Sequence, residues 1–272
     1  WIYWLFLTAL VLWALDAMAA LSWAKKNNKS INIILICSVL SVIPHIHLDW
    51  HLGQVNLLLL ALYVLMIKAY LEDRQKFVGA ILGISLFIKP FGLIFLPYLF
   101  FKKRFSSIFY TLLWSLLIGF LPFVFYPSWE QFTGLYDGWI NELMIEMSGK
   151  QDLMAEANHT IFSVLARYTP LQYLLTSPFS QKFYQLLVLG IMALGFLKFM
   201  KKGEFIPFSF TSEFALLCSW IPLLAFSSQN AYLFTLPLIV YLMFHFDKLN
   251  LPVKFLFVLG CVLSGIDIHD VV

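Results

Sequence analysis

Charged residues are scarce in this sequence, and their scarcity excludes an ordinary soluble domain. Only 12% of the 272 residues are charged, whereas 61% are hydrophobic, and the mean hydropathy is +0.83. Soluble globular domains usually contain about a quarter charged residues. A chain this apolar is expected to place most of its surface in a lipid bilayer. We therefore expect an integral, multi-pass membrane protein.

Cysteines and metal-binding patterns are also sparse. The three cysteines, Cys37, Cys218 and Cys261, lie singly in apolar runs, which excludes a disulfide framework or a cysteine metal site and indicates inert core thiols. His47 and His51 are four residues apart but have no third ligand in view, so we expect no metal. No glycine-rich phosphate loop is visible. We expect no cofactor and no nucleic-acid partner.

The start of the sequence lacks both an initiator methionine and the charged beginning of a signal peptide, because Trp1 already belongs to an apolar run. We expect that further residues precede Trp1.

Nine apolar runs predict spanning or nearly spanning helices. They cover residues 2–21, 31–48, 55–69, 77–101, 107–126, 183–199, 214–226, 231–246 and 255–268. Several are shorter than the ~20 residues of a straight span, but Trp, Tyr and Lys at their ends can adjust the fit. The sequence predicts an all-α, polytopic transmembrane bundle of about eight or nine segments, forming one integral membrane domain over residues 1–272.

The charges are strongly segregated along the chain, which indicates orientation. Basic clusters occur at Lys25, Lys26 and Lys29, at Arg74 and Lys76, at Lys102, Lys103 and Arg104, at Lys198, Lys201 and Lys202, and at Lys248 and Lys254. The positive-inside rule places these clusters in the cytoplasm. Segment 127–182 instead carries six acidic and three basic residues, a net charge of −3. We expect it to be extracytoplasmic and to carry interfacial helices, with residues 1–126 and 183–272 forming membrane helices.

Lys89 is the only charged residue in the apolar stretch 77–101. An ammonium group at the centre of a bilayer costs ~3 kcal/mol, so such a residue usually serves a function. The alternative is a lysine that reaches the interface along its own flexible side chain. Pro90 follows directly and interrupts helices, because it lacks an N–H group.

The basic clusters on either side of this stretch, Arg74 with Lys76 and residues 102–104, both favour the cytoplasm. A re-entrant hairpin that turns at Lys89-Pro90 satisfies both clusters, whereas a straight span places one of them outside. Non-helical backbone at this depth must lie against protein or a wet cavity. We favour the hairpin and keep the straight span as the alternative.

Three polar segments on the predicted outer side are candidate binding sites. The first contains Gln54 and Asn56 at the beginning of a helix, where free N–H groups favour an anion. Helix capping and contacts between helices are the alternative. Asp49 is the only acidic residue nearby and is a weak candidate for a catalytic base.

The second polar segment contains Asn158, His159 and Arg167. Arginine suits bidentate phosphate binding, with a solvated loop residue as the alternative. Asn158-His159-Thr160 also fits an N-glycosylation sequon, which is a weak pattern. Before it, apolar residues at 140, 143, 144 and 147 predict a short surface helix that could cover a cavity.

The third polar segment contains Ser227, Ser228, Gln229 and Asn230, followed by Tyr232. Hydroxyl and amide groups beside an aromatic ring suit a sugar, and a tight turn is the alternative. We take Gln229 as the candidate binding residue.

The order of these motifs resembles glycosyltransferase family 87, whose members are polyprenol-phosphate-sugar-dependent membrane enzymes of the GT-C class. The matching motifs are Gly53-Gln54-Val55-Asn56 before a leucine run, Lys89-Pro90 with Lys102-Lys103-Arg104, and Asn158-His159-Thr160 with Arg167. Two features depart from the family pattern. The family tends to have Gln at the position of His159, and Ser-Pro with Trp or His in the late segment.

The resemblance implies transfer of a hexose, expected to be mannose, from a polyprenyl phosphate to a glycolipid or cell-envelope glycan acceptor, outside a bacterial plasma membrane. The implied reaction inverts the anomeric centre without a metal. Lys89 and Arg167 would stabilise the leaving phosphate, and Gln54 and Asn158 would hold sugar or phosphate oxygens. The base implied by the family would lie before Trp1.

Two other functions fit the same pattern. A transporter or flippase of a lipid or anionic solute also requires a mid-membrane lysine beside a broken helix. A polysaccharide polymerase or ligase shares the large outer segment and the lipid-linked substrates.

Overall fold

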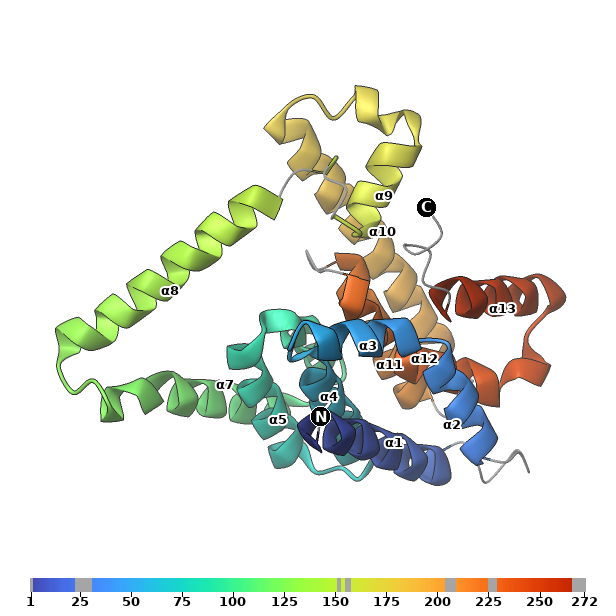
Figure 1. Ribbon diagram of the computed structural model, residues 1–272, viewed down its shortest axis with the longest axis horizontal. Helices are drawn as coiled ribbons and strands as arrows, with labels where there is room; N and C mark the ends of the chain where they lie inside the picture. The colour runs from blue at the N-terminus through green and yellow to red at the C-terminus, as the bar shows by residue number, and fades with distance from the viewer. Residues whose placement is uncertain are drawn as a thin grey trace. The chain divides into compact units, whose positions relative to one another are not determined.

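The computed structural model describes residues 2–22, 31–150, 153–154, 158–203, 209–224 and 229–265. Within these ranges the chain forms helices and connecting turns and no strand, which confirms the all-α prediction (Figure 1). The α-helices are α1 Ile2–Ser22, α2 Ile31–Leu40, α3 Ile43–His51, α4 Asn56–Leu71, α5 Gln75–Ile88, α6 Phe95–Phe101, α7 Phe105–Phe120, α8 Trp129–Lys150, α9 Ile161–Tyr168, α10 Pro178–Gly203, α11 Ser209–Leu224, α12 Leu236–Phe244 and α13 Leu251–Gly265.

Short 3-10 helices continue several of these elements, and proline explains where three of them begin. They are η2 Pro90–Ile94, η3 Leu121–Val124, η4 Pro170–Tyr173, η5 Gln229–Thr235 and η6 Phe246–Lys248. Pro90 and Pro122 lie in the first turn of η2 and η3, and Pro44 lies in the first turn of α3. Proline fits a first turn because its missing N–H is not needed there. Several predicted runs are therefore two helical pieces.

Among the described residues, two helices are long and apolar enough to cross a membrane, Phe105–Val124 and Pro178–Lys201. Ile33–Leu40 and Ile43–His51 would form a third span if the pair, which is bent by 60°, counts as one. These helices and the overall composition support a membrane protein. The expected total of eight or nine segments is not confirmed, because most other apolar helices in the described ranges have 10–17 residues.

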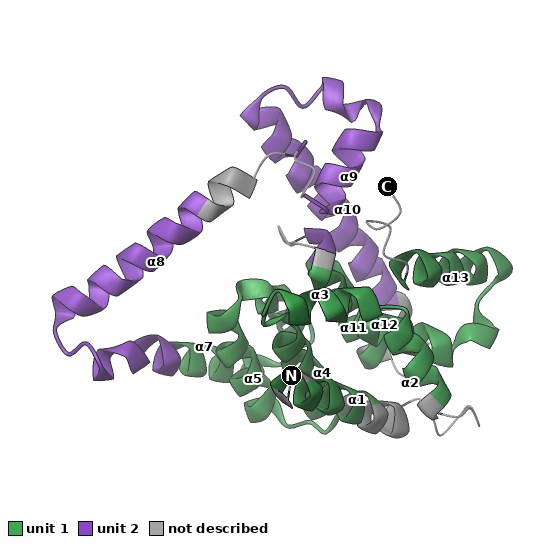
Figure 2. Ribbon diagram, viewed as in Figure 1, with its two compact units in different colours: residues 1–115, 210–221, 230–272 green, residues 116–209, 222–229 purple. Residues whose placement is uncertain are grey.

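The chain divides into two compact units (Figure 2). The first unit comprises Trp1–Ser115, Phe210–Ile221 and Asn230–Val272, and the second comprises Leu116–Ser209 and Pro222–Gln229. The predicted extracytoplasmic segment, residues 127–182, lies within the second unit. Its extracytoplasmic location remains a prediction.

Helix α4 forms the core of the first unit, where it packs against α1 and α5. It is apolar on all sides, and eleven of its residues, from Asn56 to Tyr70, are buried. A helix that is apolar on all sides lies either in a protein core or against lipid, and the burial of α4 places it in the core. The buried position of α4 fixes the location of its first turn, where Asn56 lies.

Helix α5 packs closely against α7 through Gly79 and Gly83. A Cβ atom on Gly79 would lie 2.5 Å from the Ser107 carbonyl oxygen, and one on Gly83 would lie 2.8 Å from that of Thr111. Small residues four positions apart allow helices to approach in this way. The contact holds the helix that leads to Lys89.

The second unit has a small core of its own between α9, η4 and α10. Phe162 and Ala166 of α9 pack there with Leu175 and with Tyr184 of α10. Helix α8 has 22 residues and is much longer than the short helix predicted around residues 140–147. Ile140 and Met144 are exposed on it, and its proposed role as a cover remains a prediction.

Candidate functional site

Lys89 lies at a break between two helices. Helix α5 ends at Ile88, and Lys89 adopts an extended backbone with φ −151° and ψ 137° before η2 begins at Pro90. Element η2 packs directly on α5 at Gly92. A Cβ atom at this position would lie only 2.7 Å from Leu82 Cδ1, so the two elements are in close contact. The break directs the lysine side chain out of the helical ladder while the surrounding backbone stays packed.

The two ends of the apolar stretch meet on one side. Arg104, just after α6, forms a salt bridge with Asp73, just before α5, and its guanidinium lies 5.1 Å from the Tyr70 ring centre. Asp73 and Lys103 lie in the tight turns before α5 and after α6, and both have a φ of 56°. The chain therefore reverses direction at Lys89-Pro90, as the hairpin interpretation expects. A straight helix would have separated these two ends.

The ammonium group of Lys89 is held by two amide side chains of the first polar segment. Lys89 Nζ donates to Asn56 Oδ1 at 2.9 Å and to Gln54 Oε1 at 3.3 Å. Asn56 Nδ2 also donates to Gln54 Oε1 at 3.2 Å, which orients both amides. These three predicted residues are thus brought together across more than 30 positions of sequence. Both acceptors are neutral, so the two amides orient the ammonium without adding a negative charge beside it.

Asp49 lies close to Lys89, Gln54 and Asn56 and is fully buried. Its Oδ2 atom accepts the Leu57 N–H at 3.1 Å, and its Oδ1 atom accepts Asn230 Nδ2 at 3.3 Å. Leu57 is in the first turn of α4, where backbone N–H groups have no partner within the helix. Asp49 of α3 thus caps α4 from outside and lies near enough to interact electrostatically with Lys89.

Asn230 belongs to the third polar segment, but the sequence did not single it out as a candidate binding residue. It is fully buried in η5 and joins the third polar segment to Asp49. Its only signal in the sequence is its position beside Gln229. The backbone of Gln229 begins η5, but its side chain, together with Ser227 and Ser228, falls outside the described residues.

In the second unit, Asn158 lies just before α9 and Arg167 lies in its last turn, and the structure brings the two residues into contact. Thr160 caps this helix by accepting the Ser163 N–H at 3.3 Å, and Asn158 Oδ1 accepts both the N–H and the hydroxyl of Thr160. Arg167 Nη2 donates to the Asn158 carbonyl at 2.8 Å. His159, which follows Asn158 in the sequence, is half-buried.

Two details refine these predictions. The side chain of Asn158 is buried and hydrogen-bonded, so a glycan on its amide would have to displace these contacts. Arg167 Nε is buried and has no hydrogen-bond partner in the described part of the chain. Over the same part, no three His, Cys, Asp or Glu side chains are grouped to hold a metal.

The chain matches the family model of glycosyltransferase family 87 over residues 1–219. The matched region includes Asp49, Gln54, Asn56, Lys89 and Arg167. No curated protein and no solved structure matches the chain. Since the match covers 219 of the 272 residues, the protein belongs to glycosyltransferase family 87, a family of membrane glycosyltransferases, which confirms the resemblance of its motifs.

Proposed function

We propose that the protein transfers a hexose, mannose in the first instance, from a polyprenyl-phosphate donor to a glycolipid or cell-envelope glycan on the extracytoplasmic side of a bacterial plasma membrane. Family membership supports a glycosyltransferase in a membrane. The observation that carries the choice of donor is the ammonium of Lys89, held by Gln54 and Asn56 at a helix break. A fixed cation in an apolar stretch suits the phosphate of a lipid carrier.

The proposed chemistry is one displacement at the anomeric carbon. The acceptor hydroxyl forms a bond to that carbon as the bond to the phosphate oxygen breaks, and a carboxylate takes the hydroxyl proton. Negative charge grows on the departing phosphate, so a positive group fixed beforehand lowers the barrier. Lys89 has this role in our proposal. The configuration at the sugar inverts because there is only one displacement.

Asp49 has an architectural role in this proposal. Both of its carboxylate oxygens accept hydrogen bonds, from Leu57 N–H and from Asn230, and the residue is fully buried. A general base must be within hydrogen-bond reach of the acceptor hydroxyl. The carboxylate instead holds the first turn of α4 and, through it, the amide of Asn56.

Asn158, His159, Arg167 and Gln229 are proposed to bind the donor or the acceptor. The support differs among them. The guanidinium of Arg167 donates to a backbone carbonyl, and its Nε–H has no hydrogen-bond partner among the described residues. An anion can accept a hydrogen bond from this N–H group. Asn158 supports the arginine through its carbonyl. His159 and Gln229 rest on their places in the motifs.

Donor consumption tests this function. Vesicles containing the protein are supplied with radiolabelled polyprenyl-phosphate mannose and a crude glycolipid fraction, and the release of free polyprenyl phosphate is followed. We expect release, and we expect Lys89→Ala to lower it about 100-fold, as for loss of a transition-state charge partner. The control is Lys76→Gln, an exposed lysine of α5, the helix that precedes Lys89. Transbilayer movement of the intact donor without cleavage would instead identify a flippase.

A further inference from the structure

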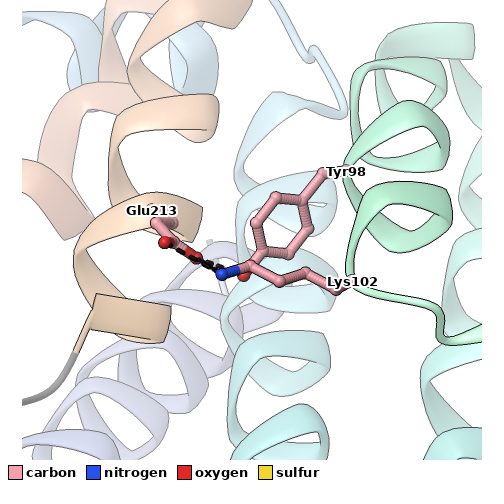
Figure 3. A network of polar contacts seen from close by, with 3 residues as sticks. All are labelled: Tyr98, Lys102 and Glu213. Carbon is pink, nitrogen blue, oxygen red and sulfur yellow. Dashed lines mark hydrogen bonds and ion pairs between the residues drawn. The ribbon is translucent and has the colours of Figure 1, made fainter. Parts of the chain in front are cut away.

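A second buried polar group lies near the open end of the hairpin, away from the turn at Lys89-Pro90. Glu213 of α11 is fully buried, and its carboxylate accepts the Tyr98 hydroxyl at 2.7 Å and Lys102 Nζ at 2.9 to 3.0 Å (Figure 3). Tyr98 lies in α6 and Lys102 is the residue that ends it. One carboxylate therefore holds two successive turns of the hairpin's returning arm.

Aromatic packing strengthens the same contact. Phe214, which follows Glu213, lies 4.9 Å from Tyr98, 5.5 Å from Phe95 and 4.9 Å from Tyr70, measured between ring centres. These rings come from α11, α6 and α4. The carboxylate therefore lies where three helices of the first unit meet. The packed rings help to hold α6 in place relative to α4 and α11.

Removing one partner from a buried ion pair is strongly unfavourable, because the other charge is left without compensation. Loss of the Glu213 charge weakens the contacts by which Tyr98 and Lys102 join the end of α6 to α11. Helix α6 follows η2 directly, and η2 is packed on α5 through Gly92. A displacement of α6 is therefore transmitted to the break that carries Lys89.

We propose that Glu213 is a positioning residue for Lys89. It fixes the returning arm of the hairpin and thereby keeps the Lys89 ammonium on Gln54 and Asn56. The value of this arrangement to catalysis rests on the proposed function, whereas the positional link itself does not.

The first test is a mutant cycle on donor consumption. Glu213→Gln should lower kcat/KM about tenfold in the natural background and less than about twofold in a Lys89→Ala background, the pattern of two residues that act through one another. Equal losses in both backgrounds would overturn the proposal, since a general loss of folding would act in both. The matched control is Glu72→Gln, whose carboxylate lies 3.9 Å from Lys68 Nζ and 3.5 Å from Arg74 Nη1 at a partly exposed site. It should leave both rates unchanged.

A rescue variant guards against misfolding. Lys102→Met combined with Glu213→Gln removes both charges, and we expect it to recover most of the activity lost in Glu213→Gln alone. No recovery in a well-folded double variant would count against the proposal.

The second test needs no activity. Lys89→Cys is placed in a chain whose Cys37, Cys218 and Cys261 are replaced by alanine, and its maleimide labelling rate is measured. Adding Glu213→Gln should change that rate at least about threefold, whereas Glu72→Gln should not, because only the first displaces packed neighbours. An unchanged rate would refute positioning. If the natural protein consumed no donor while this rate still shifted, only the proposed reaction would fail.

Discussion

Asp49 illustrates at the scale of single residues how a buried carboxylate can serve architecture. Its oxygens satisfy a backbone N–H in the first turn of α4 and the amide of Asn230. Unsatisfied buried groups cost ~1–3 kcal/mol each, so these two contacts are significant for stability. They also fix the turn from which Asn56 reaches Lys89.

Substitution of Asp49 separates this role from that of a catalytic base. Asp49→Asn retains an acceptor for Leu57, and the Asn230 amide can rotate to accept from it, so we expect most donor consumption to remain. Asp49→Ala removes an acceptor from both groups and should lower stability by about 2–4 kcal/mol, measured by thermal unfolding in detergent. If Asp49→Asn abolished turnover while melting like the natural protein, Asp49 would be the base.

Residue types and spacing singled out Lys89, Gln54 and Asn56, because a lone charge and two amides stand out in an apolar chain. The structure brings the three side chains into contact, and their role in binding stays a prediction. The link to Asn230 was not predictable in this way. It spans 181 residues, and asparagine in a polar turn has no pattern that names a distant partner.

The hairpin formed by α5, η2 and α6 is the element on which the proposed site depends. Its ends are joined by the Asp73–Arg104 salt bridge, and its returning arm is joined to α11 by Glu213. Exposed ion pairs contribute little, so the buried Glu213 contact is the more important of the two. In a membrane, such a reversal would place both basic clusters on one face.

Cysteine labelling tests that placement. With the native cysteines replaced, Lys76→Cys and Lys103→Cys should both react with a membrane-impermeant maleimide only from the cytoplasmic side, because the hairpin returns to where it began. Asp137→Cys, in the predicted outer segment, is the opposite-side control. Access to position 103 only from outside would contradict re-entry and support a straight span.

Sequence reasoning located the break in this element from Pro90 and from the two basic clusters, both of which are local signals. It did not predict the 60° bend between α2 and α3 or the full length of α8. The α5–α7 contact through Gly79 and Gly83 was missed as well. A helix bend depends on packing partners as well as on Pro44, and a polar helix such as α8 has too few apolar positions to reveal its ends.

The whole molecule combines a helical membrane architecture with motifs distributed over two compact units. Composition predicted the fold class because a chain with 61% hydrophobic residues is expected to lie in a bilayer, where helices satisfy all backbone hydrogen bonds within one segment. The number of spans was less predictable, since several apolar runs form short or broken helices. Family membership supports glycosyl transfer, and the contacts of Lys89 lead to the proposed lipid-phosphate donor.

The affinity for polyprenyl phosphate, measured by native mass spectrometry of the detergent-solubilised protein, tests this central claim most directly. We expect the natural protein to bind the lipid and Lys89→Ala to bind it about tenfold to a hundredfold more weakly, as for loss of one charged hydrogen bond. The exposed control Lys76→Gln should bind like the natural protein. Equal affinity of Lys89→Ala and the natural protein would contradict the assignment of Lys89 to the lipid phosphate.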